Sequence, residues 1–140
     1  MKLKRDPLDG VFSDLIRGRE NFTCEHCGIF IPEGERQKAH CAHIIGRKWR
    51  GGRWHPENAV CLCASCHAVF TDNPLDWTRW LEKHLGHGHL ELLQERRRQP
   101  IKYTGADRKD MLAHYRAERK RLLSERANGV TGRIEFAGWA

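Results

Sequence analysis

The sequence lacks a long apolar run. No stretch approaches the ~18 consecutive apolar residues that a membrane-spanning helix needs, and residues 1–6, Met-Lys-Leu-Lys-Arg-Asp, lack the apolar core of a secretory signal. The chain also contains no internal repeat and no low-complexity segment. We therefore expect a cytoplasmic protein without a membrane partner, and 140 residues suit one domain with an extension better than two large domains.

Basic residues, cysteine and histidine are abundant. The chain has 25 Lys and Arg against 18 Asp and Glu, a formal net charge of +7, together with six Cys and nine His. A basic surplus suggests a polyanionic partner, and Cys and His in number suggest a metal ion. Because 31% of the residues are charged and 39% hydrophobic, part of the fold should depend on something other than a large core.

Four of the cysteines have the spacing of a metal site. Cys24 with Cys27, and Cys63 with Cys66, form two C-x2-C pairs, each of which can turn two thiolates toward one ion. A reducing compartment disfavours disulfides. We predict structural Zn²⁺ bound by all four, since a small polar domain gains folding free energy from such a site. Redox-active thiols are the alternative.

Cys41 and Cys61 are left over by this pairing. Cys61 lies in the apolar stretch Ala59-Val60-Cys61-Leu62, and buried cysteine behaves as a small hydrophobic residue. We predict that both thiols pack in the core. The alternative is a different ligand set that uses Cys61 next to Cys63.

Hydrophobic periodicity outlines the secondary structure. Apolar residues at helical spacing predict a first helix over residues 9–20, with Asp9 as its N-cap. The last helix is heavily charged, so we expect it to be exposed and only partly packed, and we expect residues 129–140 to be loosely ordered. Between these ends we predict a strand over 37–45, a Gly/Arg-rich loop over 46–56 and a second strand or a turn that begins over 58–61. We also predict helices over 65–70, 75–85, 87–99 and 106–127.

A tryptophan stripe marks the helix after Pro74. Trp77, Trp80 and Leu81 recur at three- and four-residue steps, which is the pattern of a helix face packed on a core. Stacking of the tryptophans on nucleobases is the alternative.

Three polar residues stand between and beside the cysteine pairs. His43 is followed by Asn58 after fifteen positions and by His67 after a further nine, and the phrase Asn-Ala-Val-Cys-Leu-Cys-Ala-Ser-Cys-His closes the segment. With this motif, residues 24–74 resemble the HNH endonuclease family, and residues 12–19, Phe-Ser-Asp-Leu-Ile-Arg-Gly-Arg, resemble the leader helix of phage-encoded HNH proteins and NinG-like recombination endonucleases.

The resemblance implies a fold and a domain plan. The fold would be α+β, with a ββα-metal core joined by a four-cysteine zinc site. Residues 1–22 would form the leader helix, 23–74 the nuclease core, 75–128 a helical basic extension and 129–140 a tail. The implied partner is DNA, cut with the help of Mg²⁺ or Mn²⁺, in the host cytoplasm if the protein is phage-encoded. Whether it acts as a monomer or a homodimer stays open.

Each of the three polar residues suits one chemical role. A neutral imidazole near pH 7 makes His43 the predicted general base. The amide of Asn58 cannot titrate, which suits a positioning residue that holds the loop carrying His43 or, in some family members, a metal ligand. His67 would supply an imidazole ligand to the catalytic ion.

The chain departs from the family at one position. Many HNH proteins have an Asp or His metal ligand immediately before the base, where this chain has Ala42. His40 is the substitute we consider, although residues three apart in a regular strand point to opposite faces. Asp72 could also complete the ion's ligand shell, but capping the following helix is the role we favour for it.

The basic residues form two groups. Arg47, Lys48, Arg50 and Arg53 lie in the glycine-containing loop beside His43, and we predict that they contact DNA phosphates, Arg53 closest to the cut. A second group contains Arg96, Arg97 and Arg98 and the cations of the last helix. It is equally compatible with DNA binding and with a solvated surface.

Three functions are compatible with these features. The first is a metal-dependent DNA endonuclease. The second is a zinc-stapled nucleic-acid-binding module without catalytic activity, which Ala42 favours. The third is a structure-selective nuclease of recombination or packaging, which the leader helix suggests.

Overall fold

The computed structural model describes residues 5–139 and belongs to the α+β class, as predicted. It is mostly helical and contains one two-stranded antiparallel sheet. Within the described residues, no helix is both long and apolar enough to span a bilayer. The elements are α1 Pro7–Arg19, η1 Glu33–Lys38, β1 Ala39–His43, α2 Arg50–Arg53, η2 Pro56–Asn58, β2 Ala59–Cys63, α3 Ala64–Asp72, α4 Pro74–Leu85, α5 His87–Arg97 and α6 Gly105–Ala127.

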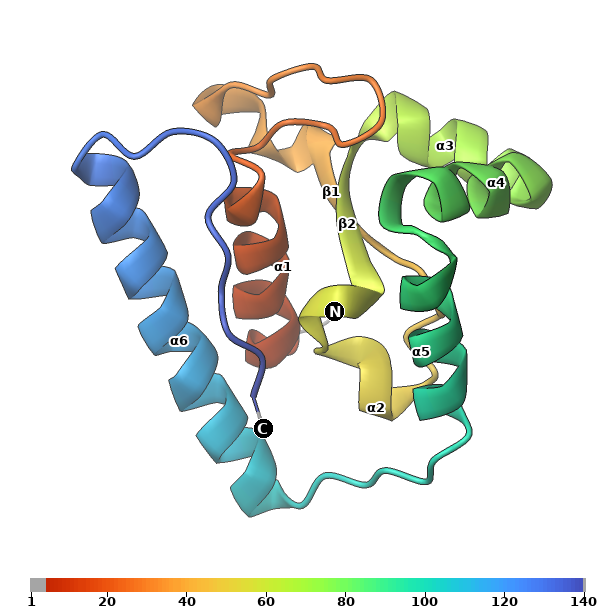
Figure 1. The fold of residues 1–140 in the computed structure, drawn as a ribbon. Coiled ribbons are helices and arrows are strands. Elements are labelled where there is room, and N and C mark those ends of the chain that lie inside the picture. Colours follow the sequence, from red (N-terminus) through yellow and green to blue (C-terminus); the bar gives the residue numbers. More distant parts are fainter. Residues whose placement is uncertain (1–4, 140) are drawn as a thin grey trace, which may run out of the picture.

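The sheet stands between two groups of helices. Figure 1 shows α1 and α6 on one side of the strands and α3, α4 and α5 on the other. In the register of the two strands, His40 lies opposite Leu62 and His43 opposite Ala59. The end of β1 therefore faces the start of β2, and α3 follows β2 without a gap.

The first helix begins earlier than predicted because its cap is Asp6. An Asp6 side-chain oxygen accepts a hydrogen bond from Leu8 N at 2.9 Å, and Pro7 supplies the fixed φ that suits the first helical position. The prediction of Asp9 as N-cap is wrong. Asp9 lies inside the first turn, which frees its carboxylate for other partners.

The main core lies between α1 and α6, and the last helix is only partly packed, as expected, because only Met111, Tyr115 and Leu122 of its 23 residues are buried. Met111 and Tyr115 of α6 are each 1% exposed, and the Tyr115 hydroxyl donates to Trp54 O at 2.5 Å. A capping box at Thr104 and Asp107 fixes the start of α6. The buried members of this cluster are Leu8, Val11, Phe12, Leu15, Ile16, Trp54, Ala59, Met111, Tyr115, Leu122, Ile134 and Phe136.

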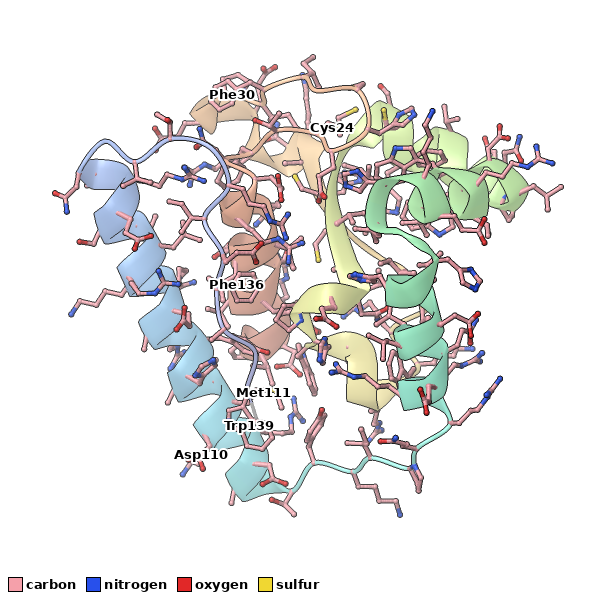
Figure 2. All side chains as sticks on the ribbon, viewed as in Figure 1. Cys24, Phe30, Asp110, Met111, Phe136 and Trp139 are labelled. Carbon is pink, nitrogen blue, oxygen red and sulfur yellow. The ribbon has the colours of Figure 1, made fainter. Side chains whose placement is uncertain are left out.

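Residues 129–139 are not the loose tail that the sequence suggested. They return along α1, where Ile134 N donates a hydrogen bond to Arg19 O at 3.0 Å. Figure 2 shows Phe136 over α1, and its ring centroid lies 6.3 Å from that of Phe12. The tail is thus part of the core because it covers apolar surface that α6 leaves open.

A second cluster supports the other side of the sheet. Leu81 is 3% exposed, and the half-buried rings of Trp77 and Trp80 pack on Phe70, which confirms that the stripe of α4 faces a core. The side chain of Asn73, not Asp72, caps α4 by accepting from Asp76 N at 3.2 Å. The capping role favoured for Asp72 is therefore wrong.

Candidate functional site

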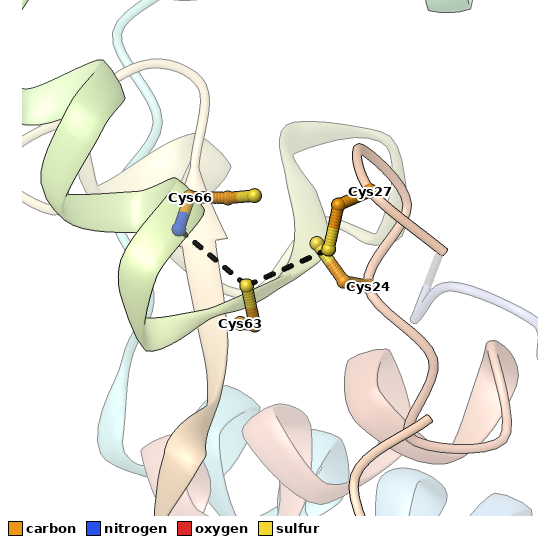
Figure 3. A group of neighbouring side chains, drawn as sticks. All are labelled: Cys24, Cys27, Cys63 and Cys66. Carbon is orange, nitrogen blue, oxygen red and sulfur yellow. Dashed lines mark hydrogen bonds between the residues drawn. The ribbon is translucent and has the colours of Figure 1, made fainter. Parts of the chain in front are cut away.

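The four predicted zinc ligands gather at one point. The Sγ atoms of Cys24, Cys27, Cys63 and Cys66 all lie within 4.8 Å of one another. Figure 3 shows the four side chains pointing toward one another. The Cys27 and Cys63 sulfurs are 3.8 Å apart. Tetrahedral thiolate ligands about 2.3 Å from zinc would be separated by about 3.8 Å. The cluster can therefore hold a metal ion such as Zn²⁺.

Hydrogen bonds and close contacts at the start of α3 position Cys63 and Cys66. Cys63 is the N-cap of α3, and its Sγ accepts a hydrogen bond from Cys66 N at 3.4 Å. His26 Nδ1 lies 3.2 Å from Cys66 Sγ. Burial and the neighbouring Cys63 thiol raise the pKa of Cys66, so metal binding has to displace protons from the cluster.

Cys41 and Cys61 stay outside the cluster, as predicted. Cys61 has no exposed surface. Burial raises the pKa of both thiols to about 12. Buried thiols with raised pKa values are inert, so Cys61 contributes packing. Cys41 is half-buried: it packs against the main core and also lines the cleft that contains His43.

Three histidines line one cleft. His40, His43 and His67 all border a cleft of about 460 Å³ between α1 and the strand β1. The Nδ1 atoms of His40 and His67 are 2.9 Å apart. His40 therefore reaches the same cleft as His43, despite the three-residue spacing that argued against it. Asp72, by contrast, is exposed and does not line this cleft.

The ring of His43 is held by the backbone of the basic loop. Its Nε2 lies 2.8 Å from Arg53 O, and because a carbonyl oxygen only accepts, Nε2 must carry the proton. The neutral ring consequently has its lone pair on Nδ1. Burial lowers the pKa of His43, and the guanidinium of Arg47 lowers it further. An unprotonated imidazole is thus favoured at neutral pH.

Asn58 fastens the ends of that loop. It is completely buried. Its Oδ1 accepts from Ile45 N at 2.9 Å, and its Nδ2 donates to Ile45 O at 2.9 Å and to Gly52 O at 3.0 Å. Since Asn58 does not line the cleft, its place in the structure suits a positioning residue and not a metal ligand.

The four predicted phosphate-binding residues share a hollow. Arg47, Lys48, Arg50 and Arg53 line an open hollow of about 390 Å³, which we call the basic hollow. Arg47 also lines the histidine cleft, so the two spaces are adjacent. Within residues 5–139, no ion pair involves Lys48 or Arg50, whereas Arg47 and Arg53 both pair with Asp9.

The second basic group is partly neutralised by its own helix and by α1. Arg119 pairs with Asp14 at 3.0 Å and Arg121 with Glu118 at 2.7 Å. Two of the four cations of the basic hollow, Arg47 and Arg53, are paired in the same way with Asp9. Ion pairing therefore does not distinguish the two basic groups as candidates for DNA contact.

The helix α1 provides a wall of the cleft that was not predicted from the sequence. Arg5, Asp9, Ser13 and Arg17 all line it. They recur at every fourth position, and this polar stripe along a helix was the signal that could have revealed them. Arg17 is anchored through Asp14, at 2.6 Å.

No protein-family model matches the chain, and no curated protein or solved structure is similar enough to count as a match. Function has to be inferred from the cysteine cluster, the histidine cleft and the basic hollow themselves. Of these, only the cleft brings together groups that can both hold an ion and move a proton.

Proposed function

We propose that the protein is a metal-dependent DNA endonuclease similar to the HNH family. The observation that carries this proposal is the convergence of His40, His43 and His67 in one cleft that shares Arg47 with the basic hollow. Hydrolysis of a phosphodiester needs a base for the attacking water and positive charge near the phosphate. The cleft offers imidazole nitrogens for the first requirement, and Arg47 with its neighbours meets the second.

The pair His40 and His67 fits a shared divalent ion. Two nitrogen ligands about 2.1 Å from an ion and at right angles to each other are about 3.0 Å apart, and their Nδ1 atoms are 2.9 Å apart. Burial lowers the pKa of His67, as does His40, so its lone pair is available for ligation. When bound there, Mg²⁺ or Mn²⁺ would polarise a phosphate oxygen.

His43 is the proposed general base. The bond from its Nε2 to Arg53 O leaves Nδ1 free to take a proton from water. Asn58 acts one step away, because it holds the loop from which that carbonyl projects. In this arrangement His43 accepts the proton, and Asn58 helps to orient the ring of His43.

The order of elements supports a ββα-metal core. The strands β1 and β2 pair in an antiparallel manner, and α3 follows β2 directly. His43 is the last residue of β1, and His67 lies in the first turns of α3. The cysteine cluster joins the start of α3 to the segment before the strands, so bound zinc would stiffen the frame that carries both histidines.

A plasmid assay tests the proposal. Zinc-loaded protein is incubated with supercoiled plasmid and Mg²⁺ or Mn²⁺, and relaxation to open circles is followed on a gel. Loss of a general base typically costs 10²- to 10⁴-fold in rate, so His43→Ala should fall by about that much. His87→Ala is the matched control, because His87 is a histidine 76% exposed on its side chain and outside the cleft.

The same assay distinguishes the endonuclease from a second candidate function, a nucleic-acid-binding module. Ala42, where a ligand would be expected, favours a zinc-stapled binding module without catalysis. If wild-type protein shifts DNA in a gel but never nicks it, the endonuclease proposal is wrong and the binding module remains. If His43→Ala nicks as fast as wild type, the assignment of His43 as the general base is wrong.

A further inference from the structure

A second hollow adjoins the histidine cleft on the side of α3 and α4. It measures about 250 Å³. His43 and His67 line both spaces, so a group in this hollow would lie next to one in the cleft. We call it the aromatic hollow; its lining residues are His43, His67, Phe70, Thr71, Pro74 and Trp77.

The aromatic wall of this hollow is fixed by its neighbours. The Trp77 ring lies 5.2 Å from Phe70 and 5.8 Å from Trp80, nearly parallel to the latter at 23°. The stack continues from Trp80 to His84, whose centroids are 4.6 Å apart at 12°. Trp77 is therefore held in place without any ligand, and rings held in this way lose little entropy when another planar group stacks on them.

The stripe of α4 divides into an inner and an outer part. Phe70 and Leu81 are 6% and 3% exposed and belong to the core. Trp77 is only half-buried, and unlike Trp80 it lines the aromatic hollow. Packing of the core does not account for an open, indole-lined space directly beside two imidazoles.

We propose that the aromatic hollow binds one unpaired nucleobase, stacked on Trp77, from a nucleotide adjacent to the phosphate in the cleft. The inference rests on the proposed function, because it takes the cleft as the phosphate site. Every base has a flat π-face that can stack on an indole, whichever base it is. A hollow of this size has no room for a duplex, so the base must be out of its helix.

The polar rim adds a point of contact. The Thr71 hydroxyl donates to His67 O at 2.8 Å, and its oxygen keeps lone pairs that can accept from a base amino group. On the other side, Arg47 places positive charge along the cleft. An apolar slot between a hydroxyl and a cation-lined cleft matches a nucleotide, which joins a flat base to an anionic phosphate.

The substrate class follows from the need for an unpaired base. Taking a base out of an intact duplex costs unpairing and unstacking free energy, and the cost is smallest where the base is already unpaired. Single strands, flaps and branch points are therefore the preferred ligands, and a continuous duplex is the weaker one.

Binding without cleavage tests the inference. Zinc-loaded full-length protein, with no Mg²⁺ or Mn²⁺ added, is titrated against a fluorescein-labelled single strand, and anisotropy gives Kd. In a set of strands, each position in turn carries an abasic site. Since stacking on an aromatic side chain is worth about 1–3 kcal/mol per base, Trp77→Ala should weaken binding by about 5- to 160-fold.

Non-additivity identifies the contact. At one position, the abasic strand should bind wild type about as weakly as the intact strand binds Trp77→Ala, with little further loss when both changes are combined. If no abasic position affects binding, or if the two losses add in full, the inference is wrong.

Conservative variants keep the test valid if Trp77→Ala folds poorly. Trp77→Phe should keep most of the affinity for the single strand, and Trp77→Leu should lose it. If the two variants bind with the same affinity, the proposal is wrong. Leu75→Ala is the matched control, since Leu75 is on the same helix, 70% exposed and outside the hollow. Because no cleavage is measured, a protein that never nicks plasmid can still pass or fail this test.

Discussion

The carboxylate of Asp9 on α1 forms a two-point ion pair with the guanidinium of Arg53. Asp9 Oδ1 accepts from Arg53 Nε at 2.9 Å, and Oδ2 accepts from Arg53 Nη2. The same carboxylate also accepts from Arg47 Nη2 at 2.7 Å and from Trp54 Nε1 at 2.9 Å, and its side chain is 11% exposed. One acidic residue thus connects the basic hollow to α1 and neutralises two of the four cations in the hollow.

We expect Asp9→Asn to destabilise the fold. An amide oxygen replaces one carboxylate oxygen and an NH₂ group replaces the other, so part of the guanidinium contact becomes donor against donor. Hydrogen bonds to charged groups contribute about 1.5–3 kcal/mol, and the free energy of unfolding in urea should fall by about that amount. Asp14→Asn is the control: its side chain is 42% exposed, and exposed pairs contribute about 1 kcal/mol or less. If Asp9→Asn and Asp14→Asn lower the free energy of unfolding equally, the ion pairs of Asp9 contribute no more to stability than an exposed pair does.

The rate of nicking should depend on pH through His43. Burial and Arg47 lower the pKa of His43 below its ordinary value of 6.5, whereas Asp9 raises it. The base is active when unprotonated, so kcat/KM should rise with pH and level off, with a midpoint below 6.5. Asp9→Asn removes a negative charge and should move that midpoint to lower pH, while Arg47→Gln should move it up. Opposite shifts in the pH profiles would exclude His43 as the titrating base.

Zinc should be required for folding and should depend on Cys63 but not on Cys41. Purified wild type should contain about one tightly bound zinc ion per chain, as a closed four-thiolate site implies. Cys63→Ser should lose the ion and the cooperative unfolding transition. Cys41→Ala should keep both, because Cys41 lies outside the cluster. The measurements are metal analysis and thermal unfolding, and a stable wild type free of zinc would contradict the assignment.

The returning tail should contribute strongly to stability. Phe136 is 6% exposed, and its ring contacts Phe12 and Tyr115. Truncation of a buried Phe to Ala costs about 3–5 kcal/mol, so Phe136→Ala should shift the urea midpoint far down. Val130→Ala, at a residue 45% exposed in the same tail, should change stability by about 0.5 kcal/mol or less. A tail that could be altered at Phe136 without effect would not be part of the core.

The two unpaired cations of the basic hollow should each contact a DNA phosphate. For duplex DNA, log Kd changes with log salt by about 0.9 per phosphate neutralised. Lys48→Gln and Arg50→Gln should each reduce the slope by about that amount, measured by anisotropy across a salt series. Arg79→Gln removes a cation that is 78% exposed on α4 and outside the hollow, and its slope should match wild type. If the slope of log Kd against log salt is unchanged in Lys48→Gln and Arg50→Gln, the basic hollow does not contact DNA.

The features that could be predicted from the sequence depend on residues that are close together along the chain. A C-x2-C pair fixes the distance between its own thiols, so Cys24 with Cys27 and Cys63 with Cys66 could be recognised before the structure. The strands β1 and β2 fall inside or close to their predicted ranges for the same reason, since apolar runs bounded by loop residues are local features.

Contacts between distant segments escaped sequence reasoning. Asp9 looked like a cap because helix starts favour Asp, although Asp6 before Pro7 was the better signal. The partners of Asp9 lie 38 to 45 positions away. His40 was doubted from strand alternation, which ignores that His67 arrives from α3 to meet it. Three-dimensional proximity of this kind has no periodic signature.

The same long-range packing sets an order in which the protein can assemble during synthesis. The cysteine cluster, both strands and α3 are complete once residue 72 has left the ribosome. The apolar face of α1 packs on Trp54 and Ala59 and also on Tyr115 and Phe136, so its burial is completed only after α6 and the tail have been synthesised. Because α1 forms one wall of the histidine cleft, a nascent chain can hold its zinc before that wall is fully packed.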